Sequence, residues 1–292
     1  MRVLILGSAG MLGHKLYQVL APDFNIVGTI QGQYRDIGKY DIFREDQIVP
    51  GINALEIKRV ESVIDKTKPQ VIINCIGIIK QLEQSNDRLL SIWVNALLPH
   101  QLQQICKERG TRMIHISTDC VFSGERGNYS EDALSDANDI YGKTKYLGEV
   151  NGEGALTIRT SLIGRELATK NGLVEWLLSN QGGEVNGFTE VIFSGFPTLH
   201  LARIIRDIVD THQNLSGIYH ISSEPISKFR LLTLMNDRMN LKIKINAYSS
   251  VHCDRSLDST LYRKATGFKP LTWDKMLGEF ATDALQYEKW RR

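Results

Sequence analysis

The 292-residue chain has little cysteine, little proline and almost no net charge, and these scarcities exclude several classes of protein. Its four cysteines, Cys75, Cys106, Cys120 and Cys253, form no C-x-x-C pair, so neither a zinc site nor a disulfide framework is indicated. Lys and Arg number 35 against 33 Asp and Glu, a net charge of +2, which argues against a basic nucleic-acid-binding surface. The seven histidines show no metal-ligand spacing, and we expect no metal site.

Long apolar runs are also missing. None approaches the ~20 residues that a membrane-spanning helix needs. The apolar N-terminal stretch is interrupted by Gly7 and Gly10 after six residues, which is too short for the core of a signal peptide. We therefore expect a cytoplasmic protein with reduced thiols, and neither a membrane nor a nucleic-acid partner.

What the chain does contain is an alternation of short apolar runs and helical patterns. Runs typical of buried strands lie at residues 2–6, 25–30, 71–79, 112–117 and 155–160. Apolar residues at helical spacing predict helices over residues 11–20, 54–66, 87–109 and 140–149. This alternation favours an α/β fold, a doubly wound parallel sheet of the Rossmann type covered on both faces.

The pattern becomes less regular in the second half, which predicts a smaller lobe. We expect a dinucleotide-binding domain over residues 1–161 and, mainly, a C-terminal α/β substrate-binding lobe over residues 162–292. A helix over 199–211 and a strand over 218–222 are expected in the second half. We also expect segments around residues 195–222 to return to the main sheet.

Three glycines follow the first predicted strand. Gly7, Gly10 and Gly13 form G-x-x-G-x-x-G at the start of a helix. Gly7 would permit a tight turn, Gly10 a close approach to a pyrophosphate, and Gly13 the packing of helix on strand. The N–H groups of Met11 and Leu12, at the helix N-terminus, would hold the phosphates. A plain strand-to-helix turn rich in glycine is the alternative.

The end of the second strand bears on the choice of cofactor. A carboxylate there would accept the ribose 2′-hydroxyl and repel a 2′-phosphate, but the first acid after the strand is Asp36. We therefore expect NADPH, with NADH as the alternative. Thr29, Gln31 or Arg35 would contact the phosphate, and Arg35 as a solvated loop charge stays an open alternative.

A tyrosine and a lysine, Tyr141 and Lys145, lie four residues apart on a predicted helix, so their side chains share a face. A free tyrosine has a pKa of ~10, and a nearby ammonium lowers that pKa by favouring the phenolate. Such a tyrosine can protonate a ketone oxygen while hydride arrives at carbon. The hydroxyl of Thr118, at the end of the preceding strand, would donate to the same oxygen. Lys145 would also bind the ribose of the cofactor.

Together these motifs resemble the extended short-chain dehydrogenases/reductases and, more narrowly, the dTDP-4-dehydrorhamnose reductase family. The stretches that carry the resemblance are GSAGMLG (7–13), VIINCIG (71–77), Asn95, STDCVFSG (117–124), YGKTK (141–145), IRTS (158–161), FPT (196–198), GIYHIS (217–222) and CDRSLDST (253–260). The resemblance implies an NAD(P)H-dependent enzyme that reduces the 4-keto group of a nucleotide-diphospho-6-deoxy-sugar, as in dTDP-rhamnose biosynthesis, for surface polysaccharide.

The resemblance also implies roles for individual residues. The catalytic set would be Thr118, Tyr141 and Lys145. The cofactor would be bound by Gly7, Gly10, Met11, Leu12, Gly13, Thr29, Arg35, Asn53, Ala54, Ile76, Gly77, Ile78, Tyr141 and Lys145, with Asn53 and Ala54 where an Asp near the adenine is common. The substrate would be met by Lys80, Thr118, Asp119, Cys120, Leu162 and Arg255, with Arg255 on the diphosphate.

Several positions depart from the family pattern. Cys120 stands where Tyr is common and Leu162 where an aromatic residue is common, so a roomier pocket for a UDP-linked N-acetylated sugar is an alternative. Lys80 would reach a substrate phosphate or carbonyl, or is a solvated loop lysine. Lys15 replaces a Glu that holds a metal at a dimer contact in some members. Lys228 is expected to be a surface charge.

The motifs leave three other functions open beside the reductase. One is a cofactor-binding regulatory subunit without chemistry, since fold alone does not imply catalysis. The others are an epimerase and a dehydratase that retain NAD, although Cys120 after Asp119 breaks the Asp-Glu pair common in dehydratases. A homodimer remains open.

Overall fold

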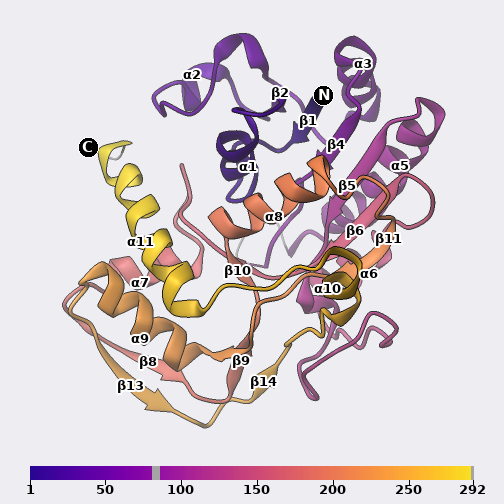
Figure 1. Cartoon of the computed structure of the whole chain (residues 1–292). Coiled ribbons are helices and arrows are strands. Elements are labelled where there is room, and N and C mark those ends of the chain that lie inside the picture. Colours follow the sequence, from indigo (N-terminus) through magenta and orange to yellow (C-terminus); the bar gives the residue numbers. More distant parts are fainter. Residues whose placement is uncertain (81–85, 291–292) are drawn as a thin grey trace. The chain divides into compact units, whose positions relative to one another are not determined.

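The computed structural model describes residues 1–80 and 86–290, and it divides into two compact units (Figure 1). Unit 1 comprises Met1–Ser117, Asp139–Ile158 and Leu201–Ile218. Unit 2 comprises Thr118–Asn138, Arg159–His200 and Tyr219–Arg292. The boundary expected between residues 161 and 162 stays a prediction. In the two described stretches, no helix combines the length and apolarity that crossing a membrane requires.

Nearly all of unit 1 is built around a seven-stranded sheet with the order β11-β6-β5-β4-β1-β2-β3. Its strands are β1 (Arg2–Leu6), β2 (Asn25–Thr29), β3 (Ile48–Val49), β4 (Val71–Asn74), β5 (Arg112–Ile116), β6 (Ala155–Arg159) and β11 (Gly217–His220). β1 pairs in parallel with both β2 and β4, so Val3 lies opposite Ile26 on one side and Val71 on the other. The strand order reverses at β1 and β4, which is the switch point where ligands bind in such sheets. The predicted doubly wound Rossmann-type sheet is confirmed.

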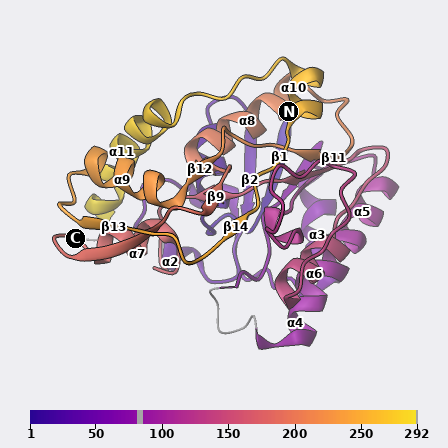
Figure 2. The same cartoon turned by 90° about the horizontal axis from the view of Figure 1, so that it is seen from below.

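Helices cover both faces of this sheet. They are α1 (Gly13–Leu20), α2 (Tyr34–Ile37), α3 (Ile57–Thr67), α4 (Arg88–Ile92), α5 (Leu98–Glu108), α6 (Ile140–Leu147) and α8 (Thr198–Asp210), with short turns η1 (Glu45–Gln47) and η3 (Trp93–Leu97). Figure 2 shows α3, α5 and α6 on one side of the sheet and α8 on the other. Leu4 and Leu6 of β1 pack in one buried cluster with Val60 of α3 and Leu102 of α5. Because successive side chains of a strand point to opposite faces, the residues between them in β1 face the other helix layer.

The helix predicted over residues 87–109 forms as three consecutive segments, α4, η3 and α5. Asp87 caps its start, since its Oδ1 accepts the N–H of Leu90 at 3.0 Å. The middle segment η3 is a π-helix. Its Asn95 lies against Gly148 at the end of α6, where a Cβ on Gly148 would fall 1.9 Å from the carbonyl oxygen of Asn95. A side chain at position 148 would thus separate α6 from η3.

The strand predicted over residues 71–79 ends at Asn74, five residues early. The N–H of Cys75 still donates to the carbonyl of Leu6 in β1 at 3.0 Å, and from Ile76 onwards the backbone bonds to side chains instead. The N–H of Ile76 donates to Asn74 Oδ1 at 3.1 Å. Asn95 holds both backbone groups of Ile78, accepting its N–H at 2.9 Å and donating to its carbonyl at 3.0 Å. The apolar run VIINCIGII therefore continues as a loop.

Unit 2 is a set of small sheets covered by helices. The strands β7 (Leu162–Ile163) and β10 (Phe196–Pro197) pair, as do β8 (Glu184–Phe188) and β13 (Lys244–Tyr248), while β12 (Ile226–Ser227), β9 (Val191–Phe193) and β14 (Cys253–Asp254) form a third sheet. The helices are η4 (Asp119–Val121), α7 (Leu173–Ser179), α9 (Lys228–Met239), α10 (Thr260–Thr266) and α11 (Trp273–Trp290). Arg165 is buried and pairs with Glu175 at 2.8 Å and with Glu288 of α11 at 2.9 Å. This pairing fixes α11 to α7 and the segment before it.

Candidate functional site

The glycine loop between β1 and α1 has the geometry that a pyrophosphate requires. Gly7 adopts a φ of +82°, in the left-handed region that favours glycine. A Cβ on Gly13 would lie 2.1 Å from the carbonyl oxygen of Gly7, so only glycine lets α1 begin this close to the loop. Gly10 is exposed, and the residue before α1 provides no side-chain cap. The N–H of His14 donates to the carbonyl of Gly10 at 3.1 Å, and the N–H groups before it are the candidates to bind an anion.

The end of β2 supports this loop. The Oγ1 of Thr29 accepts the N–H of Gly7 at 3.2 Å, and its carbonyl accepts the N–H of Ser8 at 2.8 Å. Thr29 is only 2% exposed. Arg35, by contrast, is exposed and lies 4.0 Å from the carboxylate of Asp36. Thr29, predicted at a 2′-phosphate, instead holds the glycine loop through these two bonds. Arg35 and Gln31, which are both exposed, remain the candidates to contact a 2′-phosphate.

The loops that follow β1 and β4 meet at the switch point. A Cβ on Gly7 would lie 3.2 Å from the Cγ1 of Ile76. Gly77 faces Asn95, whose Oδ1 would be 3.4 Å from a Cβ at that position. Asn95 also donates to the Oγ1 of Thr144 on α6 at 3.3 Å. Ile76, Gly77 and Ile78 are therefore held by the η3 and α6 segments beside the glycine loop.

Asn53 and Ala54 follow β3 in the chain and are both half-buried. The Oδ1 of Asn53 accepts the N–H of Leu55 at 3.0 Å. This bond fixes the side chain, and the contact with an adenine stays a prediction.

Lys145 lies in the interior of unit 1, with 4% of its surface exposed. Its Nζ donates to the carbonyl of Ile116, the last residue of β5, at 2.7 Å and lies 3.5 Å from His115 Nε2. Burial lowers the pKa of Lys145 to about 8, against the attraction of Glu149 and Cys75. The spacing with Tyr141 thus places an ammonium of unusually low pKa at the carboxyl end of β5.

His115 is a buried neighbour of Lys145. Burial lowers its pKa well below the ordinary value, so the ring is neutral. The Nδ2 of Asn74 lies 3.1 Å from the other ring nitrogen, His115 Nδ1. His115 is fully buried in the core of unit 1.

Tyr141 begins the first turn of α6 and is half-buried. Asp139 caps this helix, with Oδ1 accepting the N–H of Gly142 at 2.8 Å and Oδ2 accepting Lys80 Nζ at 2.6 Å. The same Lys80 Nζ lies 5.7 Å from the centre of the Tyr141 ring. Lys80, predicted as a substrate contact or a solvated charge, is thus anchored to the residue that caps the tyrosine helix.

In unit 2, Thr118 and Asp119 form a buried hydrogen-bonded pair. The Oγ1 of Thr118 accepts the N–H of Cys120 and lies 3.1 Å from Asp119 Oδ1. Burial raises the pKa of the Asp119 carboxyl, and Arg255, the hydrogen bonds from Thr118 and Cys120, and Lys228 oppose that rise. This carboxyl therefore holds a proton more readily than an exposed aspartate.

The remaining predicted substrate residues lie in unit 2 as well. Arg255 donates from Nε to the carbonyl of Phe122 at 2.8 Å. Leu162 lies in β7 opposite Phe196 of β10. The predicted cofactor residues therefore all belong to unit 1, while the predicted substrate residues other than Lys80 belong to unit 2.

Sequence reasoning missed Lys228, which it assigned to the surface. Lys228 is half-buried, and its Nζ lies 4.6 Å from the centre of the Phe193 ring. Burial lowers its pKa, while Asp119, Cys120 and Cys253 act in the opposite direction. One signal was available, because a lysine at the first position of a helix opposes the helix dipole.

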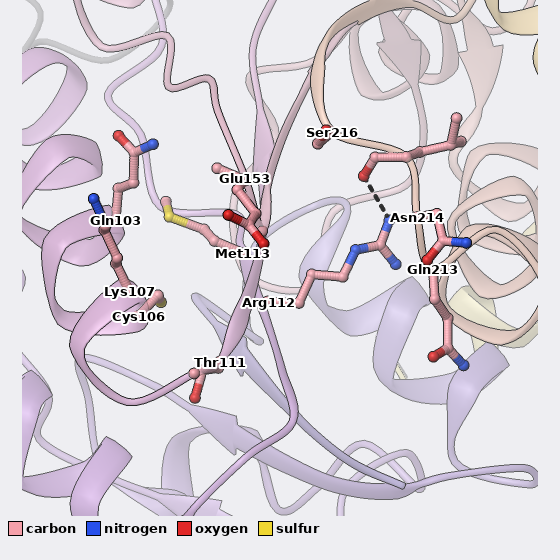
Figure 3. Close-up of a pocket in the computed structure, with 14 residues that line it drawn as sticks. Gln103, Cys106, Lys107, Thr111, Arg112, Met113, Glu153, Gln213, Asn214 and Ser216 are labelled. Atoms are coloured by element: carbon pink, nitrogen blue, oxygen red, sulfur yellow. Dashed lines mark hydrogen bonds between the residues drawn. The ribbon is translucent and has the colours of Figure 1, made fainter.

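A cavity of about 630 Å³ lies at the amino ends of β5 and β6, between α5 and residues 213–216 (Figure 3). Arg112 crosses it and donates to the carbonyls of Ile208, His212 and Leu215 at 3.1 Å each. Those bonds provide a donor to carbonyl groups in and just after the C-terminal end of α8. Since Tyr141, Lys145 and the glycine loop belong to the opposite edge of the sheet, this cavity is not the candidate site.

Among the residues that the structure describes, no group of three or more His, Cys, Asp and Glu side chains is placed to hold a metal ion. Lys15 of α1 is buried, at 1% exposure.

The family model described as "RmlD substrate binding domain" matches residues 1–285. A dTDP-4-dehydrorhamnose reductase of Aggregatibacter actinomycetemcomitans is 25% identical over 306 residues, covering 94% of this chain and 97% of the relative. The methionine adenosyltransferase 2 subunit beta of Xenopus tropicalis is 25% identical over 258 residues, covering 82% and 72%.

The fold also resembles that of solved structures. The dTDP-4-dehydrorhamnose reductase of Bacillus anthracis, crystallised with NADP, superposes with a TM-score of 0.76 at 22% identity. That match covers 97% of this chain and 99% of the other. At this identity the match shows the shared fold.

Proposed function

Because the chain belongs to the RmlD substrate binding domain family, we propose that it is an NADPH-dependent oxidoreductase that reduces the 4-keto group of a nucleotide-diphospho-6-deoxy-4-keto-sugar. The observation that carries the proposal is the placement of Tyr141 and Lys145 on α6, with Lys145 Nζ bonded to the end of β5. The relative of Aggregatibacter, matched over nearly its whole length, bears the name of this activity.

The residues of unit 1 fit a dinucleotide. A Cβ on Gly10 would meet the Gly7 carbonyl oxygen at 3.3 Å, so a glycine at this position keeps the loop open for a phosphate. The uncapped start of α1 and the exposed Arg35 supply donors for the pyrophosphate and for a 2′-phosphate. NADPH, or NADH as the alternative, would supply a hydride to the ketone carbon.

Side chains of this protein would donate the proton that reduction of the ketone requires. Tyr141 donates its phenolic proton to the ketone oxygen as that oxygen gains charge. The Lys145 ammonium stabilises the phenolate that remains, and it binds the cofactor ribose. A proton from solvent then restores the phenol. A positioned acid of this kind contributes about 10²- to 10⁴-fold in rate.

Thr118 would be the second donor to the ketone oxygen. Its hydroxyl hydrogen is directed at Asp119 when that carboxyl is ionised, at 3.1 Å. A substrate ketone oxygen beside Thr118 would accept that hydrogen in place of Asp119.

The sugar would lie against Asp119, Cys120, Leu162 and Arg255. A dTDP-linked 6-deoxy-4-keto-sugar, a precursor of surface polysaccharide, is the first substrate to test. The small side chain of Cys120 favours including UDP-linked N-acetylated 4-keto-sugars as the alternative. A homodimer and a cytoplasmic location belong to the same proposal.

A second candidate is a cofactor-binding subunit without chemistry of its own, which the similarity to the Xenopus methionine adenosyltransferase 2 subunit beta favours. The presence of Thr118, Tyr141 and Lys145 together supports the reductase over this alternative, because a subunit without chemistry does not need all three.

The test follows the absorbance of NADPH and NADH with a panel of dTDP- and UDP-linked 4-keto-sugars. We expect stoichiometric oxidation of NADPH with at least one sugar. Tyr141→Phe should bind NADPH as wild type does and lose about 10²- to 10⁴-fold in turnover. Wild-type turnover in Tyr141→Phe would contradict the mechanism, and binding of NADPH without oxidation across the whole panel would favour the subunit.

A further inference from the structure

Two segments of unit 2, distant in sequence, are brought together on strand β9. β12 pairs antiparallel with β9, so Ser227 lies opposite Ile192. β14 pairs in parallel with the same strand, and Asp254 also lies opposite Ile192. The residues that follow, Lys228 and Arg255, therefore start from the two sides of one strand.

The loop after Thr118 is joined to β14. The N–H of Asp254 donates to the carbonyl of Gly124 at 2.7 Å, and Arg255 Nε donates to the carbonyl of Phe122. A Cβ on Gly124 would lie 2.6 Å from Cys253 Sγ, so only glycine allows this approach. Asp119 and Cys120 are thus fixed on the same side of unit 2 as the start of α9.

Lys228 lies within this group. Its Nζ faces the Phe193 ring at 4.6 Å, and the Asp119 carboxylate, buried at 8% exposure, acts on it electrostatically. It also occupies the first position of α9, where the helix dipole disfavours a cation. Burying an ammonium at such a position reduces stability unless a partner compensates.

We propose that Lys228 is a substrate-binding residue whose ammonium, together with the nearby Asp119 carboxyl, holds an oxygen substituent of the sugar ring. The inference rests on the proposed function and names a feature of its substrate. Asp119 disfavours a diphosphate at this position, since its charge repels the phosphate oxygens. A neutral hydroxyl or acyl oxygen accepts from Lys228 without that repulsion, and a hydroxyl also donates to Asp119.

The position of Lys228 also accounts for the departure at Cys120. A thiol is a weak hydrogen-bond donor, so the donor that a tyrosine would have supplied there is lost. Lys228, on which Cys120 acts electrostatically, supplies a stronger donor from α9. The substrate therefore carries an acceptor oxygen on the part of the sugar that faces Cys120.

The test compares Lys228→Met with Arg230→Met, an exposed position two residues further along α9. We expect Lys228→Met to raise the KM for the keto-sugar about ten- to a hundredfold, with kcat changed far less. The affinity for NADPH and the melting temperature should stay at wild-type values. Arg230→Met should leave all four quantities unchanged. Lys228→Gln, which keeps a neutral donor, should recover part of the loss.

A calorimetric titration with unreactive dTDP- and UDP-sugars gives a second measurement that needs no turnover. Loss of sugar-nucleotide affinity in Lys228→Met, with NADPH affinity retained, supports the inference even if no keto-sugar of the panel is reduced. An unchanged KM, or unchanged sugar-nucleotide affinity, in folded Lys228→Met would overturn it while leaving the reductase proposal intact.

Discussion

Lys145 illustrates how a single buried charge links stability to chemistry. Its folded-state pKa of about 8 lies below the ordinary 10.5, because burial disfavours the ammonium. Between these two values the folded chain binds fewer protons than the unfolded chain. The free energy of unfolding should therefore rise with pH through this window, and the cost of the buried ammonium is present in full below it.

Lys145→Met should consequently stabilise the fold while abolishing turnover. At about pH 7 we expect its free energy of unfolding to exceed that of the wild type by roughly 1 to 3 kcal/mol, because the cost of the buried charge is removed. The loss of the hydrogen bond to the Ile116 carbonyl offsets part of this gain. Near pH 10 the difference should shrink. Denaturant unfolding at the two pH values measures both effects, and a variant less stable than wild type at neutral pH would contradict the assignment.

Arg35 concerns the choice between the two cofactors. Its guanidinium is exposed and lies 4.0 Å from the Asp36 carboxylate, so its removal should not disturb the fold. We expect Arg35→Ala to weaken NADPH binding about tenfold and NADH binding little. Fluorescence titration with both cofactors measures this. Equal losses, or none, would remove Arg35 from the phosphate site.

The sequence predicted that Tyr141 and Lys145 share one face of a helix, because residues four apart on a helix lie on the same side. Both residues lie on α6, as predicted. The sequence could not predict the depth of Lys228, because the burial of that lysine depends on strands β9, β12 and β14, which are two or three residues long. Nor could the sequence show that the Oγ1 of Thr29 accepts the N–H of Gly7, because that bond joins the ends of two different strands.

At the scale of elements, the contact between α6 and η3 sets the position of the proposed catalytic helix. Gly148 ends α6 against Asn95, and Asn95 in turn bonds to Thr144 of α6 and to Ile78. One asparagine therefore ties α6 to the loop after β4. A π-helical segment such as η3 is uncommon and is frequent at functional sites.

Gly148→Ala tests this contact. A Cβ placed 1.9 Å from a backbone oxygen forces α6 away from η3, so we expect a loss of about 2 kcal/mol or more in the free energy of unfolding and a marked loss of turnover. Gly278→Ala is the control, because Gly278 lies within α11 with nothing within 4 Å of its added Cβ. That variant should gain up to about 1 kcal/mol. Comparable melting temperatures for the two variants would refute the close contact.

Long apolar patterns predicted elements well, and short or side-chain-dependent ones poorly. β1 matches its predicted range over residues 2–6, and the helix predicted over 140–149 begins at the same residue as α6. The strand predicted over 71–79 was too long, because side chains of Asn74 and Asn95 replace the sheet bonds from Ile76 onwards. The strands β7 and β10 are two residues long, too short to show the alternation of apolar and polar residues that predicts a strand.

At the scale of the whole molecule, the predicted cofactor residues and most predicted substrate residues fall in different units. Unit 1 gathers the glycine loop, the loop after β4, Tyr141 and Lys145 around one edge of the parallel sheet. Unit 2 gathers Asp119, Cys120, Lys228 and Arg255 around its small sheets. The sequence alternation predicted the parallel sheet of unit 1, because parallel sheets impose that alternation. The short strands of unit 2 leave little pattern in the sequence.

We propose that this molecule delivers a hydride from a reduced nicotinamide to the ketone carbon of a sugar nucleotide, with the proton supplied through Tyr141. Hydride transfer is measured with NADPH carrying deuterium at the transferable C4 position, followed by mass spectrometry and NMR of the sugar product. We expect one deuterium on the former ketone carbon and an unlabelled hydroxyl. Product without deuterium on that carbon, or deuterated NADPH left intact beside a converted sugar, would contradict it.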